Sequence, residues 1–196
     1  KLNLILKGGL QMEFNEVIQN RRSIRHFTLQ EVEQDKVDQL IDCARLCQSA
    51  KNRQPWSFMI LKGQEKNKVA DMMMESSNKE SKEIFGYVNT VKYSAEIIKR
   101  APLLIAVFQV YEEEWFASDL LSTGAAIEHI CLECVNLGLG SVWIGDIWFN
   151  ERAISKYLGC DHLHLISAVA IGYPAETPKP RPRKSREEIL LSKKLD

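Results

Sequence analysis

The stretch LLIAVFQ, from Leu103 to Gln109, decides the fold class of this chain. Every residue except the last is apolar, so a strand formed here needs cover on both of its faces. Trp56–Lys62 (WSFMILK) has the same character and predicts a second strand that is covered on both faces. Two further apolar runs, Ser141–Ile144 and Leu165–Ile171, predict two more strands.

Apolar residues at helical spacing occupy the sequence around these strands. We expect helices near 14–18, 37–49, 64–77, 116–138 and 150–158, the fourth closed by a glycine C-cap and the fifth opened by an asparagine N-cap. Residues 78–100 are interpreted as a helix with an irregular segment. Because strands and helices do not alternate strictly, the pattern favours the α+β class.

The composition is typical of one globular domain. The chain has 196 residues, of which 45% are hydrophobic and 27% charged, so disorder is excluded as its main state. A folded chain of this length buries about 70% of the surface that it exposes when unfolded. We therefore expect a single domain over residues 12–196, and we interpret residues 1–11 as a vector-derived or disordered leader before Met12.

Charge and targeting signals limit the possible partners. Lys plus Arg number 26 and Asp plus Glu number 26, and this balance argues against a protein that coats nucleic acid or an anionic membrane. No run approaches the roughly 20 apolar residues that span a bilayer. Without a targeting signal, we expect a cytoplasmic location.

The five cysteines point to packing rather than to metal or disulfides. An odd number in a chain of this length does not suit a disulfide framework, so reduced thiols are expected. Cys43/Cys47 and the C-x-x-C pair Cys131/Cys134 fall at core-facing positions of expected helices. Free cysteine is a common core residue, and we expect no metal site.

Two basic segments have the chemistry of a phosphate site. RRSIRHF brings three guanidinium groups and a hydroxyl within five residues, and a proline-stiffened tail carries two more guanidinium groups on alternate positions. Arginine makes planar, charge-assisted contacts to phosphate oxygens. The candidate residues are Arg21, Arg22, Ser23, Arg25, Arg181 and Arg183. The alternative for each segment is a solvated basic turn or tail.

Two other segments have the chemistry to contact a flat heterocycle. The loop QSAKNRQPWSF offers hydroxyl and amide groups from Ser49, Asn52 and Gln54. The alternative for this loop is a capped connection between helix and strand. In GLGSVWIGD, Gly145 would let backbone approach a flat ligand closely, although the spacing does not match a dinucleotide-binding loop.

Taken in order, RRSIRHF, SAKNRQPWSF, GLGSVWIG, and AVAIGYPAE followed by RPR resemble the nitroreductase family of FMN-dependent oxidoreductases. The resemblance runs from about Phe14 to Glu188. It implies a mixed central sheet flanked by helices, in an intertwined homodimer with an extended C-terminal arm. It also implies two FMN molecules at the dimer interface.

The resemblance assigns a role to each segment. The FMN phosphate, ribityl chain and pyrimidine edge would be held by Arg21, Arg22, Ser23 and Arg25, with Arg181 and Arg183 joining on the phosphate. The partner subunit would bring Ser49, Asn52 and Gln54 over the flavin, and the backbone of Ile144 and Gly145 would lie on the ring. Glu128 and His129 depart from the residues of many relatives, and residues 78–118 resemble nothing that can be assigned.

The activity implied by the resemblance is electron transfer from NAD(P)H through FMN to a nitroaromatic, quinone or similar acceptor, by a ping-pong mechanism. The chemistry belongs to the cofactor, so we expect no catalytic side chain, with Arg25 as electrostatic support. Two alternatives stay open. One is a flavoenzyme of the same fold that performs reductive dehalogenation or flavin breakdown, and the other is a non-enzymatic flavin-binding redox sensor.

Overall fold

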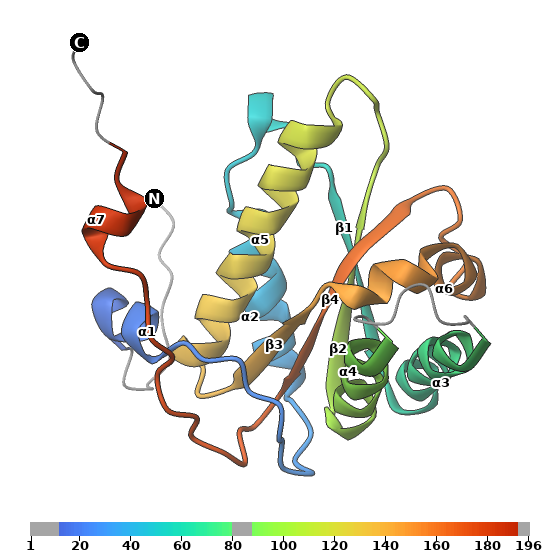
Figure 1. Cartoon of the computed structure of the whole chain (residues 1–196), viewed down its shortest axis with the longest axis horizontal. Helices are drawn as coiled ribbons and strands as arrows, with labels where there is room; N and C mark the ends of the chain where they lie inside the picture. The colour runs from blue at the N-terminus through green and yellow to red at the C-terminus, as the bar shows by residue number, and fades with distance from the viewer. Residues whose placement is uncertain (1–11, 80–87, 192–196) are drawn as a thin grey trace.

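The computed structural model describes residues 12–79 and 88–191, and it has a four-stranded sheet at its centre (Figure 1). The strand order is β1-β2-β4-β3, and every neighbouring pair is antiparallel. The strands are β1 (Trp56–Lys62), β2 (Leu103–Gln109), β3 (Gly140–Ile144) and β4 (His164–Gly172). All four predicted strands are confirmed, and the expected leader at residues 1–11 lies outside the described residues.

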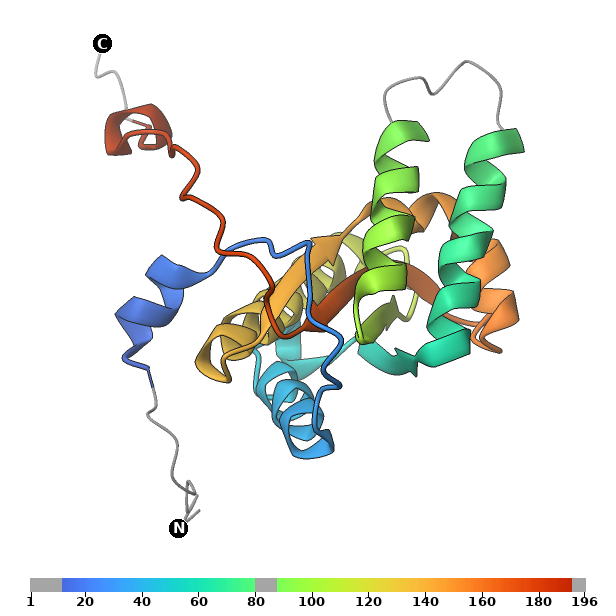
Figure 2. The same cartoon turned by 90° about the horizontal axis from the view of Figure 1, so that it is seen from below.

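Helices cover both faces of this sheet, which confirms the α+β class. One face carries α2 (Gln34–Arg45) and α5 (Phe116–Asn136), and the other carries α3 (Gly63–Lys79), α4 (Val88–Arg100) and α6 (Glu151–Tyr157) (Figure 2). Each of these helices was expected from the sequence. Among the described residues, no helix is long and apolar enough to cross a bilayer.

The strand that decides the fold class sits inside the sheet, and its successive side chains enter opposite layers. All seven residues of β2 are buried. The layer under α3 and α4 receives Leu104, Ala106 and Phe108, and the layer under α2 and α5 receives Leu103, Ile105 and Val107. Apolar side chains on both alternations therefore require helices on both faces.

The edge strand β1 differs from its expectation. Its only buried residue is Leu61, and Ser57 is exposed. The prediction that Trp56–Lys62 is covered on both faces is met only in part. Met59 and Leu61 pack on one core layer and Phe58 and Ile60 on the other, but all of these except Leu61 stay partly exposed. At the edge of the sheet the strand has one neighbouring strand instead of two.

The ends of three helices were expected from local sequence signals, and one of the three expectations is confirmed. Gly138 has φ +71°, and the Leu139 N–H donates to the Cys134 carbonyl at 2.7 Å, which confirms the glycine C-cap of α5. Asn150 stands at the N-cap position of α6 but makes no capping hydrogen bond with its side chain, so that detail is wrong. The α2 helix ends at Arg45, before the expected position near residue 49.

The chain beyond β4 leaves the body of the molecule in an extended conformation, as its four prolines predict (Figures 1 and 2). A short helix, α7 (Arg186–Ile189), follows. Its N-terminus is a capping box in which Ser185 and Glu188 bond each other's backbone N–H. The sequence signal for this box is present in Ser185–Glu188, and the helix was missed.

A short pairing joins the segment after α1 (Phe14–Asn20) to the sheet. Ser23 bridges Ser141 in parallel, and the Ile24 N–H donates to the Ser141 carbonyl at 2.9 Å. A Cβ on Gly140 would lie 2.7 Å from the nearest atom of the Ile24 side chain. The absence of a side chain at Gly140 therefore lets the basic segment lie against β3.

We expect Gly140→Ala to lower the free energy of unfolding by about 1–3 kcal/mol, because the added methyl group overpacks against Ile24. Urea-induced unfolding measures the change. Gly145→Ala is the matched control, since its Cβ meets nothing within 4 Å and its backbone is in the right-handed helical region. The control should change stability by less than about 0.5 kcal/mol. Equal stability of Gly140→Ala and the unsubstituted chain would contradict the close contact.

Candidate functional site

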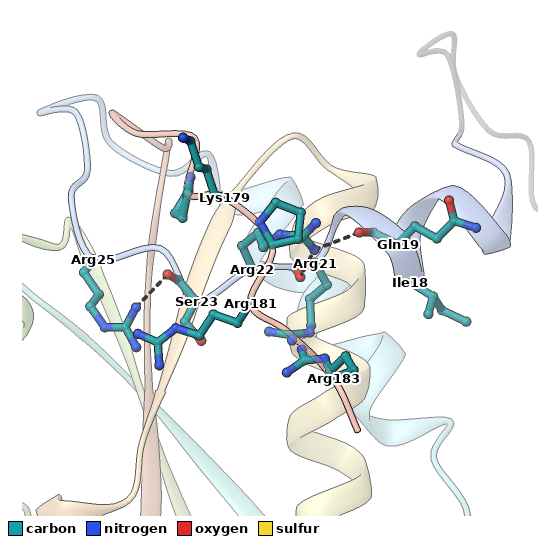
Figure 3. Close-up of a pocket in the computed structure, with 11 residues that line it drawn as sticks. Ile18, Gln19, Arg21, Arg22, Ser23, Arg25, Lys179, Arg181 and Arg183 are labelled. Carbon is teal, nitrogen blue, oxygen red and sulfur yellow. Dashed lines mark hydrogen bonds between the residues drawn. The ribbon is translucent and has the colours of Figure 1, made fainter. Parts of the chain in front are cut away.

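A pocket of about 490 Å³ lies where the segment after α1 meets the C-terminal arm (Figure 3). Six cationic side chains line it, and the remaining lining residues are uncharged. The cations are Arg21, Arg22, Arg25, Lys179, Arg181 and Arg183. The two basic segments that the sequence singled out therefore form one site, although they lie about 150 residues apart along the chain.

Backbone pairing and one carboxylate bring the two segments together. The Glu176 Oε1 atom accepts from the backbone N–H of Arg25 at 2.7 Å and of His26 at 3.2 Å. The Ala175 N–H donates to the His26 carbonyl at 2.9 Å, and the Thr28 N–H donates to the Tyr173 carbonyl at 2.9 Å. Glu176 thus fixes the basic segment through its backbone and leaves the guanidinium groups available.

The arginines of the first segment are oriented by carbonyl groups. Arg22 donates from Nη1 to the Gln19 and Arg21 carbonyls at 2.7 and 2.8 Å, and Arg25 donates from Nη1 to the Ser23 carbonyl at 3.0 Å. Arg21 lies 3.5 Å from the half-exposed carboxylate of Glu128. Each guanidinium has five N–H donors, so most donors of Arg22 and Arg25 remain for a ligand.

The strand β3 connects this pocket to the predicted glycine. Ser23 of the pocket bridges Ser141, and Gly145 follows four residues later, a distance of about 13 Å along an extended chain. Ile144 is buried, whereas Gly145 is exposed. The segment that carries the phosphate candidates thus pairs with the start of β3, and the predicted ring contact, Gly145, follows the end of that strand. The separation of these two points suits a phosphate ester that has a flat group at its other end.

The loop with Ser49, Asn52 and Gln54 is not brought into this pocket. It contains the short helix η1 (Ala50–Asn52), which lies beside the N-terminal half of α5 (Figure 1). Arg21, which lines the pocket, faces Glu128 in the second half of that helix. The loop contacts α5 at Asp119 and Ser122, six to nine residues or about 9–14 Å before Glu128, so the predicted site residues form two separate groups within one chain.

The backbone of this loop has an uncommon conformation. Lys51, Asn52 and Gln54 have φ of +50°, +55° and +48°, in the left-handed region that non-glycine residues rarely occupy. The Ser49 hydroxyl accepts from the Gln54 N–H at 3.0 Å and closes the loop on itself. Asn52 and Gln54 are exposed, so a ligand can reach their side chains, and the Gln54 Nε2 atom donates to the Asn52 carbonyl at 3.5 Å.

Three contributors to these groups were missed in the sequence. Lys179 lines the pocket, and its place in Lys179-Pro-Arg-Pro-Arg183 continues the alternation of basic residues, which is a signal that could have identified it. Glu176 holds the basic segment, and Arg53 holds the loop. Neither of these two has a local signal, because each acts on a residue far away in the sequence.

Three of the five cysteines, Cys47, Cys131 and Cys134, are buried in the layer between α2 and α5. Cys43 on α2 is partly buried and donates from Sγ to the His129 carbonyl of α5 at 3.6 Å, and Cys160 packs against the opposite layer. Burial raises the pKa of the Cys43 and Cys131 thiols to about 11, so both stay protonated at neutral pH. In the part of the chain that is described, no three His, Cys, Asp or Glu side chains are grouped so as to hold a metal ion.

The sequence matches a known family over most of its length. The profile of the nitroreductase family matches residues 18–173. This range contains the first basic segment, the Ser49–Gln54 loop and β3 with Gly145. The C-terminal cations of the pocket lie beyond the matched range.

Individual relatives agree with the family match. A Methanothermobacter thermautotrophicus protein, provisionally named NADH dehydrogenase/NAD(P)H nitroreductase, is 28% identical over 93% of this chain and 88% of that protein. Iodotyrosine deiodinase 1 of Rattus norvegicus is 24% identical over 92% of this chain and 69% of that protein. A provisionally named nitroreductase of Desulfovibrio desulfuricans, crystallised with FMN, has a TM-score of 0.75 at 24% identity, over 95% of this chain and 99% of that chain.

We expect the cysteines to be unreactive and free of metal in the native protein. A buried thiol with a pKa near 11 stays protonated at pH 8, so Cys131 should react with a thiol reagent only after unfolding in guanidinium. Elemental analysis should find zinc and iron well below one equivalent per chain. Stoichiometric metal, or rapid labelling of Cys131 in the folded protein, would show that these side chains are more than core packing.

Proposed function

The chain belongs to the nitroreductase family, and on this premise we propose that it is an FMN-dependent oxidoreductase of the cytoplasm. It passes two electrons from NAD(P)H to a nitroaromatic, quinone or similar small acceptor. The single observation that carries the proposal is the meeting of Arg21, Arg22 and Arg25 with Arg181 and Arg183 around one pocket. A phosphate monoester at one end of a flavin is the anion that such a pocket suits.

The residues present fit FMN in both charge and layout. Arg22, Arg25 and Arg183 offer charge-assisted donors to the phosphate, and no carboxylate is among the described residues that line the pocket. From the pocket, β3 leads to the exposed Gly145, where the flavin ring would meet backbone rather than a side chain. The bridge between Ser23 and Ser141 sets the spacing between these two contacts. FAD would need a further site for its second phosphate and adenine, and neither basic segment supplies one.

When bound, FMN supplies the hydride acceptor and the two-electron donor of the reaction. The chain contributes binding and electrostatics. Arg25 directly follows Ile24, whose N–H pairs with the Ser141 carbonyl of β3, and its guanidinium would stabilise negative charge on the pyrimidine edge of the ring. The Gly145 N–H would orient the reactive ring nitrogen. Neither residue gains or loses a proton in this scheme.

A second copy of the chain would complete the site. The Ser49–Gln54 loop contacts α5 at Asp119 and Ser122 and is not among the described residues that line the cationic pocket, so a second copy that brings its own loop to the pocket would complete the binding residues. The α5 helix is apolar on nearly all sides: Leu120, Ala125 and Leu132 are partly exposed, and Leu121 is 76% exposed. A helix of this kind is normally buried. Two copies paired along α5 would cover it and bring the loop of one chain to the pocket of the other.

Reductive dehalogenation is the second candidate reaction, because iodotyrosine deiodinase is among the relatives. Both reactions use the same binding residues, and they differ in the acceptor. A turnover screen with NADPH, NADH, a nitroaromatic, a quinone and a halogenated phenol separates them. A protein that binds FMN but is reduced by neither nicotinamide would instead be a flavin-binding sensor.

The cofactor is tested by reconstitution with FMN and by two arginine variants. We expect Arg21→Ala and Arg183→Ala each to weaken FMN binding roughly ten- to a hundredfold, since charge-assisted hydrogen bonds contribute about 1.5–3 kcal/mol each. Quenching of flavin fluorescence measures the dissociation constant. Arg152→Ala, outside the residues that line the pocket, is the control and should leave the constant unchanged.

Two outcomes would count against this assignment. A protein that stays colourless after reconstitution with FMN would refute the cofactor. Unchanged affinity in both arginine variants would favour the alternative of a solvated basic turn and tail.

We expect the protein to be a homodimer. Light scattering should give twice the chain mass of 22.5 kDa, with an interface above about 2,000 Å². Leu121→Glu should favour the monomer and weaken FMN binding, because it places a charge on the exposed apolar face of α5 that the second copy would cover. Tyr93→Glu is the control, because it also replaces an exposed apolar side chain by a carboxylate, but on α4 at the opposite face of the sheet. It should leave the dimer and the FMN affinity unchanged. A monomer that holds FMN with full affinity would exclude the shared site.

We expect ping-pong kinetics, with the nicotinamide and the acceptor occupying the same face in turn. Double-reciprocal plots at several acceptor concentrations should therefore be parallel. Arg25→Ala should slow reduction by NAD(P)H roughly ten- to a hundredfold and weaken FMN binding by less, because its charge acts on the reduced state. Intersecting lines, or an FMN-saturated variant elsewhere that is inactive by several orders of magnitude, would contradict this scheme.

A further inference from the structure

An ion network ties the Ser49–Gln54 loop to the start of α5. The Arg53 Nε and Nη2 atoms donate to the two carboxylate oxygens of Asp119, each at 3.1 Å, and Nη2 also lies 2.9 Å from Oε1 of Glu112. The Asp119 carboxylate is completely buried. The Arg53 guanidinium lies 4.8 Å from the centre of the Trp115 ring, over its face. This bidentate pairing with the buried Asp119 carboxylate fixes both the position and the plane of the guanidinium.

The residues on either side of Arg53 in the sequence are more exposed than Arg53 itself. Arg53 is partly buried and reaches inward, whereas Asn52 and Gln54 on either side are exposed. These two residues also have positive φ, and Gln54 precedes Pro55, a position where the helical regions are disfavoured. Such a backbone persists only where surrounding contacts hold it. Arg53 supplies the strongest of those contacts. The others include hydrogen bonds from the Gln54 N–H to Ser49 Oγ, from the Asn52 N–H to the Ser49 carbonyl and from the Ala50 N–H to Ser122 Oγ, together with the Lys51 ammonium over the Trp115 ring.

We infer that Arg53 is a positioning residue that holds the Ser49–Gln54 loop in its left-handed conformation, so that Asn52 and Gln54 are pre-arranged for the flavin. This inference rests on the proposed function, since it assigns the loop to an FMN site. Arg53 itself contacts no cofactor. Its effect on binding comes from keeping the neighbouring amides in place, which lowers the ordering cost of association.

The alternative is that Arg53 only neutralises a buried carboxylate. Removing Arg53 alone would leave Asp119 buried and unpaired, and the variant would then fail through instability. The double substitution Arg53→Gln with Asp119→Asn avoids this, because it removes both charges and keeps side chains of similar size. Arg53→Lys is the second variant, since it keeps the charge but cannot grip two oxygens. Arg45→Gln, which loses an exposed ion pair with Asp42 on α2, is the matched control.

Two measurements test the inference on the full chain. Hydrogen exchange of the apoprotein reports on the loop, and the amides of Ala50 and Gln54 should exchange at least about tenfold faster in the double variant, while the sheet amides stay unchanged. FMN titration should show roughly tenfold weaker binding in the double variant and in Arg53→Lys. The control should match the unsubstituted chain in both measurements.

The outcomes separate this inference from the proposed function. Unchanged exchange of the loop in the double variant overturns the inference, whatever the result with FMN. Full FMN affinity in a stable double variant also overturns it, because neutralisation of Asp119 would then be the whole role. If the unsubstituted chain binds no FMN, the proposed function fails, and faster exchange would show only that Arg53 orders the loop.

Discussion

The burial of β2 and β4 on both faces is the constraint on which the rest of the molecule depends. Apolar side chains on both alternations of these strands require helices above and below the sheet, and the core consequently has two layers. The long helix α5 belongs to one of these layers, and both groups of predicted site residues lie along it. The helix that covers the central strands therefore also sets the distance between these two groups.

The cationic pocket is held together by backbone rather than by its side chains. Six like charges around about 490 Å³ repel one another, and among the described residues only Arg21 of this group has a carboxylate within ion-pair distance. The bridge from Ser23 to β3 and the grip of Glu176 on the Arg25 N–H supply the attraction that opposes this repulsion. An arrangement of this kind is stabilised further by a bound dianion, which links the stability of the pocket to its cofactor.

The loop and the pocket show two ways of preparing a binding site. In the pocket, guanidinium groups are oriented by nearby carbonyls and remain partly free. In the loop, one guanidinium pairs with the buried carboxylate of Asp119 and the exposed carboxylate of Glu112, and the neighbouring amides are left exposed. The pocket offers positive charge to a ligand, and the loop offers amide groups in a fixed backbone conformation.

The sequence by itself determined the four strands, the main helices and the chemistry of each segment, because apolar period, glycine caps and clusters of arginine are local properties. It also identified most of the pocket, from RRSIRHF and the alternating tail. Only the tertiary structure decided that these segments meet, since 151 residues separate Arg25 from Glu176. The same holds for the exposure of β1, which depends on its place at the sheet edge, and for the pairing of Arg53 with Asp119 across 66 residues. A residue whose partner is remote in the chain leaves no periodic or local pattern, so its role becomes visible only when the fold brings the two together.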